Sequence, residues 1–268
     1  DILQFPAATL LRFCLNHHLL QINDRPQWRT VRGGGRCYVE KMLPAIHQVR
    51  HASPVRQVVR NEHGALVSTD SDTQAFDCVV LAGHAPDMLR LLADADEAER
   101  KVLGAFRYQP NKVWLHTDPA LLPRNRAVWS AWNYLAQSHD AQTRAVCVSY
   151  LINRLQPLPF SQPVVVTLNP FSPPAPEHTL AQFDYDHPLF DNAAIAAQAV
   201  LPQLQGHRHT WFAGAWTRYG FHEDGLRSAL KVAADFACLP AWARLEEDHG
   251  HTAAVARPRD ACAVAPGH

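Results

Sequence analysis

WFAGA (Trp211–Ala215), WTRYGFHE (Trp216–Glu223) and DGLRSA (Asp224–Ala229) form one continuous stretch that decides the fold. The first block predicts a short buried strand that ends in a glycine turn, and a helix begins with the third block. Asp224 is typical of a helix N-terminus, and Gly225 lets a ligand approach the backbone closely. The free N–H groups and positive dipole end of such a helix favour an electron-rich ligand. A capped helix that follows a buried strand and binds nothing remains the simpler alternative.

The composition is that of a globular protein with a substantial core. The chain has 268 residues, of which 47% are hydrophobic and 19% charged, and 25 Lys and Arg balance 25 Asp and Glu. This neutral balance argues against nucleic acid as a partner. No apolar run reaches the length of a transmembrane span, although peripheral membrane contact stays open. The scattered cysteines predict reduced, mostly buried thiols in a cytoplasmic protein.

The first third of the chain predicts helices and then strands. The apolar spacing predicts helices over 6–20 and around 39–46. From residue 49 the period changes to two, with strands over 54–60 and 65–69 on either side of a turn at 61–64. A continuous apolar run over 76–82 predicts a buried, parallel strand, and Gly83 ends it.

The remainder predicts a second sheet and three more helices. Segments 112–117, 127–134, 145–152 and 164–168 have the character of strands in an antiparallel sheet. The predicted helices cover 94–105, 191–204 with an interruption near Pro202, and 224–238. The last strand is expected at 210–213, and the tail from residue 241 has no regular pattern.

Several phrases in this order resemble one family. They are DRPQWRTVRGGGRCYVEKM (24–42), ERKVLGAFRYQPNKVWLHTD (99–118), VTLNP (166–170), FDYDHPLFD (183–191) and GFHEDGLRSAL (220–230). Together with WFAGAW they resemble the FAD-dependent flavin amine oxidase family. The resemblance is strongest to bacterial predicted NAD/FAD-binding oxidoreductases found beside cyclopropane-fatty-acid synthase-like enzymes, and it spans residues 2–240.

The resemblance implies a mixed α/β fold, in which a Rossmann-like FAD-binding domain is interleaved with an amine-oxidase-type substrate domain. It assigns 1–32 to the substrate domain, 33–90 to the FAD domain, 91–207 to the substrate domain and 208–240 to a C-terminal FAD-binding strand, loop and helix, with a disordered tail at 241–268. Members carry a GxGxxG motif after an early strand, and this sequence has none. We therefore expect an N-terminally truncated member whose FAD-binding domain is incomplete.

The resemblance also assigns residues to FAD binding. Gly33 and Gly34 match the family's later glycine turn, and Val55 matches the backbone contact to adenine. Gly83 matches the end of the return strand, and Gly214 with Ala215 matches the glycine after the last strand. The helix start beside the flavin is matched by Asp224, Gly225 and Leu226. The sequence departs from the family at Ala215, where members carry an acid.

Three residues are candidates for catalysis. Lys112 falls where amine oxidases hold a water near the flavin, and a buried lysine there would relay a proton. A solvent-facing strand lysine is the alternative. Trp216 and Tyr219 would line the substrate side of the flavin, together with Phe221. Core packing under a loop is the alternative for these aromatic residues.

Other kinds of site find little support. The chain has 16 histidines, but none has the spacing of a zinc motif, and we expect no metal site. Glu223 and Asp224 are adjacent and would point apart on a helix. Ser149, Ser228 and Cys147 lack the surroundings of an activated nucleophile.

The resulting hypothesis is an FAD-dependent oxidoreductase that transfers a hydride to or from a small-molecule or lipid substrate. An acyl chain is the lipid substrate that the resemblance suggests. Two alternatives stay open: a truncated or degenerate module without catalysis, and a protein that binds an apolar ligand without redox chemistry. The sequence leaves the electron acceptor and the oligomeric state open.

Overall fold

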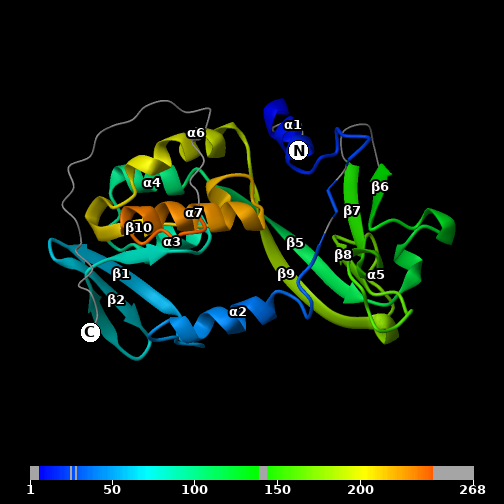
Figure 1. The fold of residues 1–268 in the computed structure, drawn as a ribbon, viewed down its shortest axis with the longest axis horizontal. Helices are drawn as coiled ribbons and strands as arrows, with labels where there is room; N and C mark the ends of the chain where they lie inside the picture. The colour runs from blue at the N-terminus through cyan, green and yellow to red at the C-terminus, as the bar shows by residue number, and fades with distance from the viewer. Residues whose placement is uncertain (1–5, 25, 28, 139–143, 244–268) are drawn as a thin grey trace. The chain divides into compact units, whose positions relative to one another are not determined.

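The computed structural model describes residues 6–24, 26–27, 29–138 and 144–243. Helices and strands are mixed, as the predicted fold class requires, and they divide into two compact units (Figure 1). Unit 1 combines the residues up to 26 with 49–107 and those from 188 onward, and unit 2 combines 27–48 with 108–187. Each unit is thus built from separate stretches of the chain, which agrees with interleaved domains.

A three-stranded antiparallel meander forms part of unit 1. Its strands are β1 (Val55–Asn61), β2 (Gly64–Thr69) and β3 (Thr73–Phe76), in the order β1-β2-β3. Asn61 faces Gly64 across the hairpin, so the predicted turn at 61–64 is confirmed. Gly64 has φ of 146°, and a Cβ there would lie 2.1 Å from the carbonyl oxygen of Phe76. Only glycine fits this turn without displacing β3.

Two parallel strands form the second sheet of unit 1. Strand β4 (Val79–Leu81) pairs with β10 (Thr210–Phe212), although about 130 residues separate them in the sequence. All three residues of β10 are buried. The predicted parallel strand at the end of the apolar run is confirmed with bounds shorter than 76–82, but its predicted burial was wrong: Leu81 is buried, whereas Val80 is 44% exposed. Because the strands are parallel, their carboxyl ends meet at one edge.

Unit 1 also contains helices, some of which contact these two sheets. The helices are α1 (Ala7–Asn16), α3 (Ala85–Leu91), α4 (Glu97–Leu103), α6 (Asn192–Val200) and α7 (His222–Asp235). Asp96 caps α4 with a reciprocal capping box, and Asp191 accepts a bond from the N–H of Ala194 at the start of α6. Pro202 lies in a 3-10 turn (Leu201–Gln203) that follows α6, as its position predicted. Helix α7 lies against β10, where Val232 packs on Trp211 and Ala213 (Figure 1).

The bounds of the two units differ from those of the predicted domains, and which unit would hold FAD stays a prediction. Segments 6–24, 91–107 and 188–207, predicted for the substrate domain, belong to unit 1, and 33–48, predicted for the FAD domain, belongs to unit 2. A buried polar network holds the first part of 91–107 in unit 1: Arg60 of β1 bonds to Asp94 and to Glu99 of α4. Local sequence patterns do not reveal such long-range pairs.

Unit 2 is organised around a five-stranded sheet. Its order is β6-β7-β8-β5-β9, and its strands are β5 (Arg107–His116), β6 (Trp132–Ser138), β7 (Arg144–Leu151), β8 (Val165–Leu168) and β9 (Thr179–Leu189). The pairs that β8 makes with β5 and with β7, and the pair of β6 with β7, are antiparallel as predicted. Strand β9 was not predicted. The short helices α2 (Arg36–Met42) and α5 (Ile152–Leu155) also belong to this unit.

A chain of buried hydrogen bonds crosses the sheet of unit 2. The backbone N–H of Asp118 donates to Nδ1 of His116 at 3.1 Å, so Nε2 carries the proton and donates to Oγ1 of Thr167 at 2.8 Å. Thr167 then bonds to Oγ of Ser149 at 2.8 Å. Ser149 donates to the carbonyl oxygen of Leu121 at 3.2 Å. Ser149 is therefore a satisfied core residue and has no access to a substrate.

Other predictions concern cysteines, membranes and the tail. The described cysteines are free, but only Cys147 is fully buried and Cys238 is exposed, so the expectation of mostly buried thiols was wrong. A cysteine in a short amphipathic helix is buried only where it lies on the face that packs against the core. The scattered positions of the cysteines in the sequence therefore do not predict their burial. Within the described ranges, no helix has both the length and the apolar composition needed to cross a bilayer. The tail from residue 244, predicted to be disordered, lies outside the described residues.

Candidate functional site

The candidate site lies at the carboxyl ends of β4 and β10. The pairing continues one residue past the strands, where the N–H of Ala213 donates to the carbonyl oxygen of Leu81 at 3.0 Å. Gly83 and Gly214 follow at this edge. Nε1 of Trp216 donates to the carbonyl oxygen of Gly83 at 2.9 Å and so joins the two loops. We call the backbone at 83, at 214–216 and in the first turn of α7 the strand-end site.

The fold itself requires glycine at position 214. Its φ of 150° is a conformation that residues with a side chain rarely adopt, and a Cβ there would lie 2.6 Å from Nε1 of Trp216. Because the indole ring of Trp216 is buried at 3% exposure, it has no room to move aside. Gly214 is therefore explained by packing, whether or not a ligand binds.

Ser228 fastens the turn at Gly214 to helix α7. Its Oγ accepts a bond from the N–H of Gly214 at 2.8 Å and donates to the carbonyl oxygen of Gly225 at 2.7 Å. This hydroxyl is buried and satisfied on both sides. The sequence pointed to Ser228 only as a possible nucleophile, and this structural role was missed. A serine one turn into a helix is typical of such a backbone clamp, but only the fold shows which loop it holds.

The side chain of Asp224 closes the loop that leads into α7. Its Oδ2 accepts bonds from the N–H groups of Tyr219 at 3.2 Å and Phe221 at 3.0 Å, and Nε of Arg218 lies 3.6 Å from Oδ1. Asp224 is buried, whereas the neighbouring Glu223 is exposed and pairs with Arg227. The predicted divergence of the two acids on a helix is confirmed, so they do not form an acid–base pair.

Helix α7 begins two residues earlier than predicted. It starts at His222, and the N–H groups of Asp224 and Gly225 donate to the carbonyl oxygen of Phe221 at 3.0 and 3.2 Å. These two groups are thus already bonded within the helix. In the turn that precedes them, the N–H groups of Tyr219 and Phe221 donate to Asp224, and that of Gly220 donates to the carbonyl oxygen of Ala215. The prediction that the helix begins at Asp224 was wrong because its side chain folds back onto the preceding loop.

Gly225 differs from Gly214 because the fold does not require it. Its backbone is helical, and among the described residues, apart from its chain neighbours and its own helix backbone, the atom nearest a Cβ built there is the backbone N of Ala215, at 3.8 Å. That distance is an ordinary van der Waals contact. Glycine in a helix costs about 0.5–1 kcal/mol relative to alanine. Packing within the described residues therefore does not explain this glycine, whereas close approach of a ligand would.

One of the three catalytic candidates, Trp216, lies at the strand-end site, and another, Tyr219, lies in the loop between that residue and α7. Trp216 is buried, and its ring packs edge-on against Phe106 with centroids 4.6 Å apart. This packing is the alternative that the sequence left open, and a role of Trp216 in catalysis stays a prediction. Tyr219 is half-buried in the loop before α7. Its contact with a substrate stays a prediction.

The remaining predicted residues belong to other elements of the fold. Lys112 is in unit 2, where its exposed side chain pairs with Asp184 at 2.6 Å. It is thus the solvent-facing strand lysine that was the alternative to a buried proton relay. Val55 is the first residue of β1, and Leu226 is exposed on α7. Gly33 and Gly34 lie in unit 2 before α2, and both have positive φ, which explains the glycines as a turn. Their predicted contacts with FAD stay predictions.

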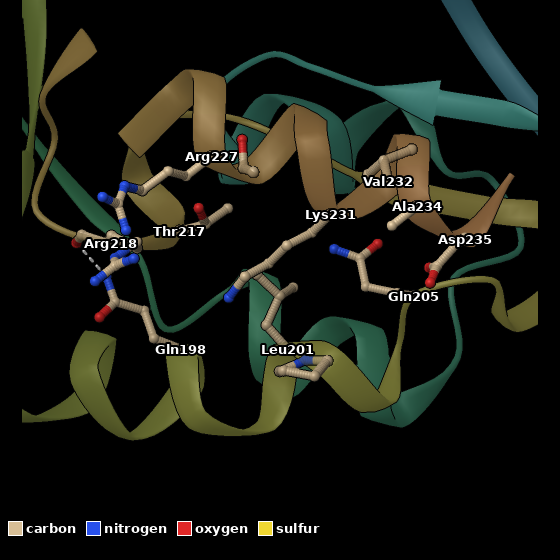
Figure 2. A pocket seen from close by; sticks show the side chains of 12 residues that line it. Gln198, Leu201, Gln205, Thr217, Arg218, Arg227, Lys231, Val232, Ala234 and Asp235 are labelled. Carbon is tan, nitrogen blue, oxygen red and sulfur yellow. Dashed lines mark hydrogen bonds between the residues drawn. The ribbon is translucent and has the colours of Figure 1, made fainter. Parts of the chain in front are cut away.

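The structure also contains a pocket that the sequence analysis did not identify. It lies beside α7 in unit 1 and has a volume of about 340 Å³ (Figure 2). The side chains that line it come from α6, from the turn after it, from the 217–218 loop and from α7. Among the described residues, no group of three or more His, Cys, Asp or Glu is arranged to hold a metal ion.

Comparison with known proteins yields similar solved structures at low sequence identity. No protein-family profile matches the chain. Putrescine oxidase bound to putrescine has a TM-score of 0.55 and 14% identity over 76% of this chain and 53% of the oxidase. The fatty acid isomerase from P. acnes that produces CLA has a TM-score of 0.53 and 13% identity over 76% of this chain and 52% of the isomerase.

The chain spans about half the length of these solved proteins. The TM-scores of 0.53 and 0.55 show a shared fold, whereas identities of 13% and 14% leave activity, substrate and cofactor open. The predicted fold class is confirmed: the chain has the mixed helix-and-sheet fold found in putrescine oxidase and in this fatty acid isomerase.

Proposed function

We propose that this chain holds the flavin end of a non-covalently bound FAD in an oxidoreductase. The observation that carries the proposal is Gly225, a glycine in the first turn of α7 that packing does not require. It lies beside the carboxyl ends of two parallel strands. Ligands of open α/β sheets bind outside this edge. Among the predicted ligand contacts, Gly225 is the one whose identity a bound group explains best.

The residues present fit such a group. The backbone at Gly83, Gly214 and Ala215 would face it from the strand ends, and the first turn of α7 would face it from the side. The positive end of the helix dipole favours electron-rich groups, such as the pyrimidine edge of a reduced flavin. Val55 would contact the adenine, as the family resemblance implies. Since Ala215 replaces the family's acid, no carboxylate is available there for the linker of the cofactor.

The chemistry belongs to the class of hydride transfer, for which a flavin supplies the redox-active ring. The protein supplies position and exclusion of water. Trp216 fixes the distance between the two glycine loops through its bond to Gly83. Ser228 and Asp224 fix the start of α7 relative to the same loops. Tyr219, in the loop that Asp224 closes, is the candidate for contact with the substrate.

The proposed substrate is a small molecule with an amine or an acyl chain. One protein with this fold is a putrescine oxidase solved with putrescine, and another is a fatty acid isomerase. A shared fold supports the class of small-molecule substrate and does not choose between the two. The choice requires assays with both classes.

Substitution of Gly225 tests the proposal. Gly225→Ala and Gly225→Leu would be compared with the unmodified chain by FAD titration, followed through flavin fluorescence, and by thermal unfolding without FAD. Gly225→Ala should raise the stability by up to about 1 kcal/mol because alanine favours a helix. It should weaken FAD binding, and Gly225→Leu should weaken it further. Ala229→Leu, on the exposed side of the same helix, is the matched control and should leave binding unchanged.

Opposite changes in stability and affinity would support a cofactor at the strand-end site. If Gly225→Leu binds FAD as tightly as the unmodified chain, the glycine does not face the cofactor and the proposal fails. It also fails if the unmodified chain does not alter flavin fluorescence at any concentration tested.

A further inference from the structure

The pocket beside α7 has three features that together define a ligand class. They are a cationic end, an apolar middle and an acidic far end. Figure 2 shows Arg218 and Arg227 at one end and Asp235 at the other, with Lys231 extending from α7 across the space between. The volume of about 340 Å³ falls within the range of small-molecule sites.

The two arginines are held in place by other residues. The side-chain amide of Gln198 donates to the carbonyl oxygens of Trp216, at 2.9 Å, and Arg218, at 2.5 Å, which fixes the backbone that carries Arg218 (Figure 2). Nε of Arg227 donates to Oε1 of Glu223 at 2.9 Å. A guanidinium has five N–H donors and can bind a second acceptor beside an existing one. The guanidinium of Arg227 and the backbone of Arg218 are thus oriented before any ligand arrives, which lowers the entropic cost of binding. Nε of Arg218 also lies 3.6 Å from Oδ1 of Asp224, so each arginine has a carboxylate beside it.

The middle of the pocket is apolar. Its walls are Leu201 and Pro202 on one side and Val232 and Ala234 of α7 on the other. Leu201 and Val232 are buried core residues and give the walls a rigid base. Such walls favour a hydrocarbon group over a second polar one.

The far end carries a fixed negative charge. Asp235 lines the pocket, and its Oδ2 accepts a bond from Nε1 of Trp211 at 2.9 Å. A carboxylate at this position repels a second anionic group on a ligand. The charges of the lining residues therefore orient a ligand in one direction, with its anionic head toward the arginines.

We propose that the pocket between α6 and α7 binds small amphipathic monoanions, with a carboxylate or phosphate at Arg218, Arg227 and Lys231 and a hydrocarbon group against Leu201 and Val232. The pocket runs along the side of α7 and borders the strand-end site, because Ser228 lines the pocket and its Oγ accepts the N–H of Gly214. It needs no flavin. Its occupation and the binding of FAD are separate properties of the chain.

Calorimetric titration of the chain without FAD tests this site. The probes would be decanoate, decyl phosphate, decanol and decanedioate, each below the concentration at which it forms micelles. Decanoate or decyl phosphate should bind, and the ratio of their affinities shows which head group is preferred. Decanol lacks the charge, and decanedioate places a second carboxylate near Asp235. The affinity of each should therefore be lower than that of decanoate by a factor of about ten or more.

Variants identify the residues responsible. Arg227→Gln and Lys231→Gln should each weaken decanoate binding about tenfold, because each removes one charge from the head-group end. Arg56→Gln is the matched control: Arg56 is an exposed arginine of β1 that also pairs with a carboxylate, Asp70, and lies outside the pocket. It should leave the affinity unchanged. Circular dichroism confirms folding, and if Arg227→Gln is unfolded, the exposed Lys231 decides the result.

The proposal is overturned if decanol binds as tightly as decanoate, since the head group would then not be recognised. It is equally overturned if no probe gives saturable binding, or if both pocket variants bind like Arg56→Gln. None of these results bears on FAD binding at Gly225.

Discussion

Arg60 of β1 and Glu99 of α4 form an ion pair in the core of unit 1, with Nη2 of Arg60 2.8 Å from Oε2 of Glu99. Their side chains are 0% and 1% exposed. Arg60 also bonds to Asp94, and Glu99 accepts the N–H of Asp96 in the capping box of α4. The pair therefore joins the meander to the helical segment that follows β4.

Loss of charge at Glu99 should strongly destabilise the protein. Glu99→Gln keeps an acceptor for the N–H of Asp96. It removes one of the two negative charges that balance the buried guanidinium of Arg60. Removing one partner of a buried pair costs about 3–5 kcal/mol, and the lower end applies here because Asp94 remains. Urea unfolding measures the change. Asp70→Asn, in the exposed pair with Arg56, should leave the midpoint unchanged. Equal midpoints for the two variants would contradict this role of the buried pair.

Acid should destabilise unit 1 through Asp94. Burial disfavours its charged form, but the backbone N–H of Arg60 and the charges of Arg60 and Arg208 outweigh burial and lower its pKa. Because the pKa is lower in the folded state, the stabilisation is complete above the unfolded value of about 3.9 and is lost as the pH falls through the folded value. Urea midpoints between pH 7 and pH 3 should fall less steeply for Asp94→Asn than for the unmodified chain. If the urea midpoints of the two proteins fall in parallel with pH, Asp94 does not contribute to the loss of stability in acid.

Mild acid should destabilise unit 2 through His116. Burial lowers the pKa of this imidazole, and its Nδ1 already accepts the N–H of Asp118. As the pH falls below the unfolded pKa of about 6.5, the unfolded chain takes up a proton that the folded chain refuses, and stability drops by at most about 1.4 kcal/mol per pH unit. His116→Asn retains an acceptor for Asp118 but does not titrate. The difference in unfolding free energy between the two proteins should therefore shrink from pH 8 to pH 5, and a constant difference would exclude this mechanism.

Gly214→Ala should destabilise the strand-end site even without a ligand. The positive φ and the contact with the ring of Trp216 both oppose a side chain, and the expected cost is about 1–3 kcal/mol. Thermal unfolding measures it, with Gly225→Ala as the comparison, since that change is expected to stabilise. A neutral Gly214→Ala variant would mean that the loop relaxes freely.

The sequence determined those features whose causes are local. The apolar blocks around Trp211 and at 79–82 predict short strands because continuous apolar runs are typical of parallel strands. The turn at 61–64 predicts its hairpin because glycine alone tolerates the backbone there. Strand β9 was missed because most of its side chains are exposed and it has Pro188 and two aspartates, so no alternating pattern marks it.

Only the tertiary structure decided which residues act together. Arg60 and Glu99 are 39 positions apart, and their pairing depends on how α4 packs against β1. Gly214 and Gly225 look alike in the sequence, but a buried indole explains the first and no contact requires the second. Side chains from α6 and α7 meet in one pocket only after the chain folds. Short-range patterns specify elements, whereas burial and contact across the chain decide the chemical role of each side chain.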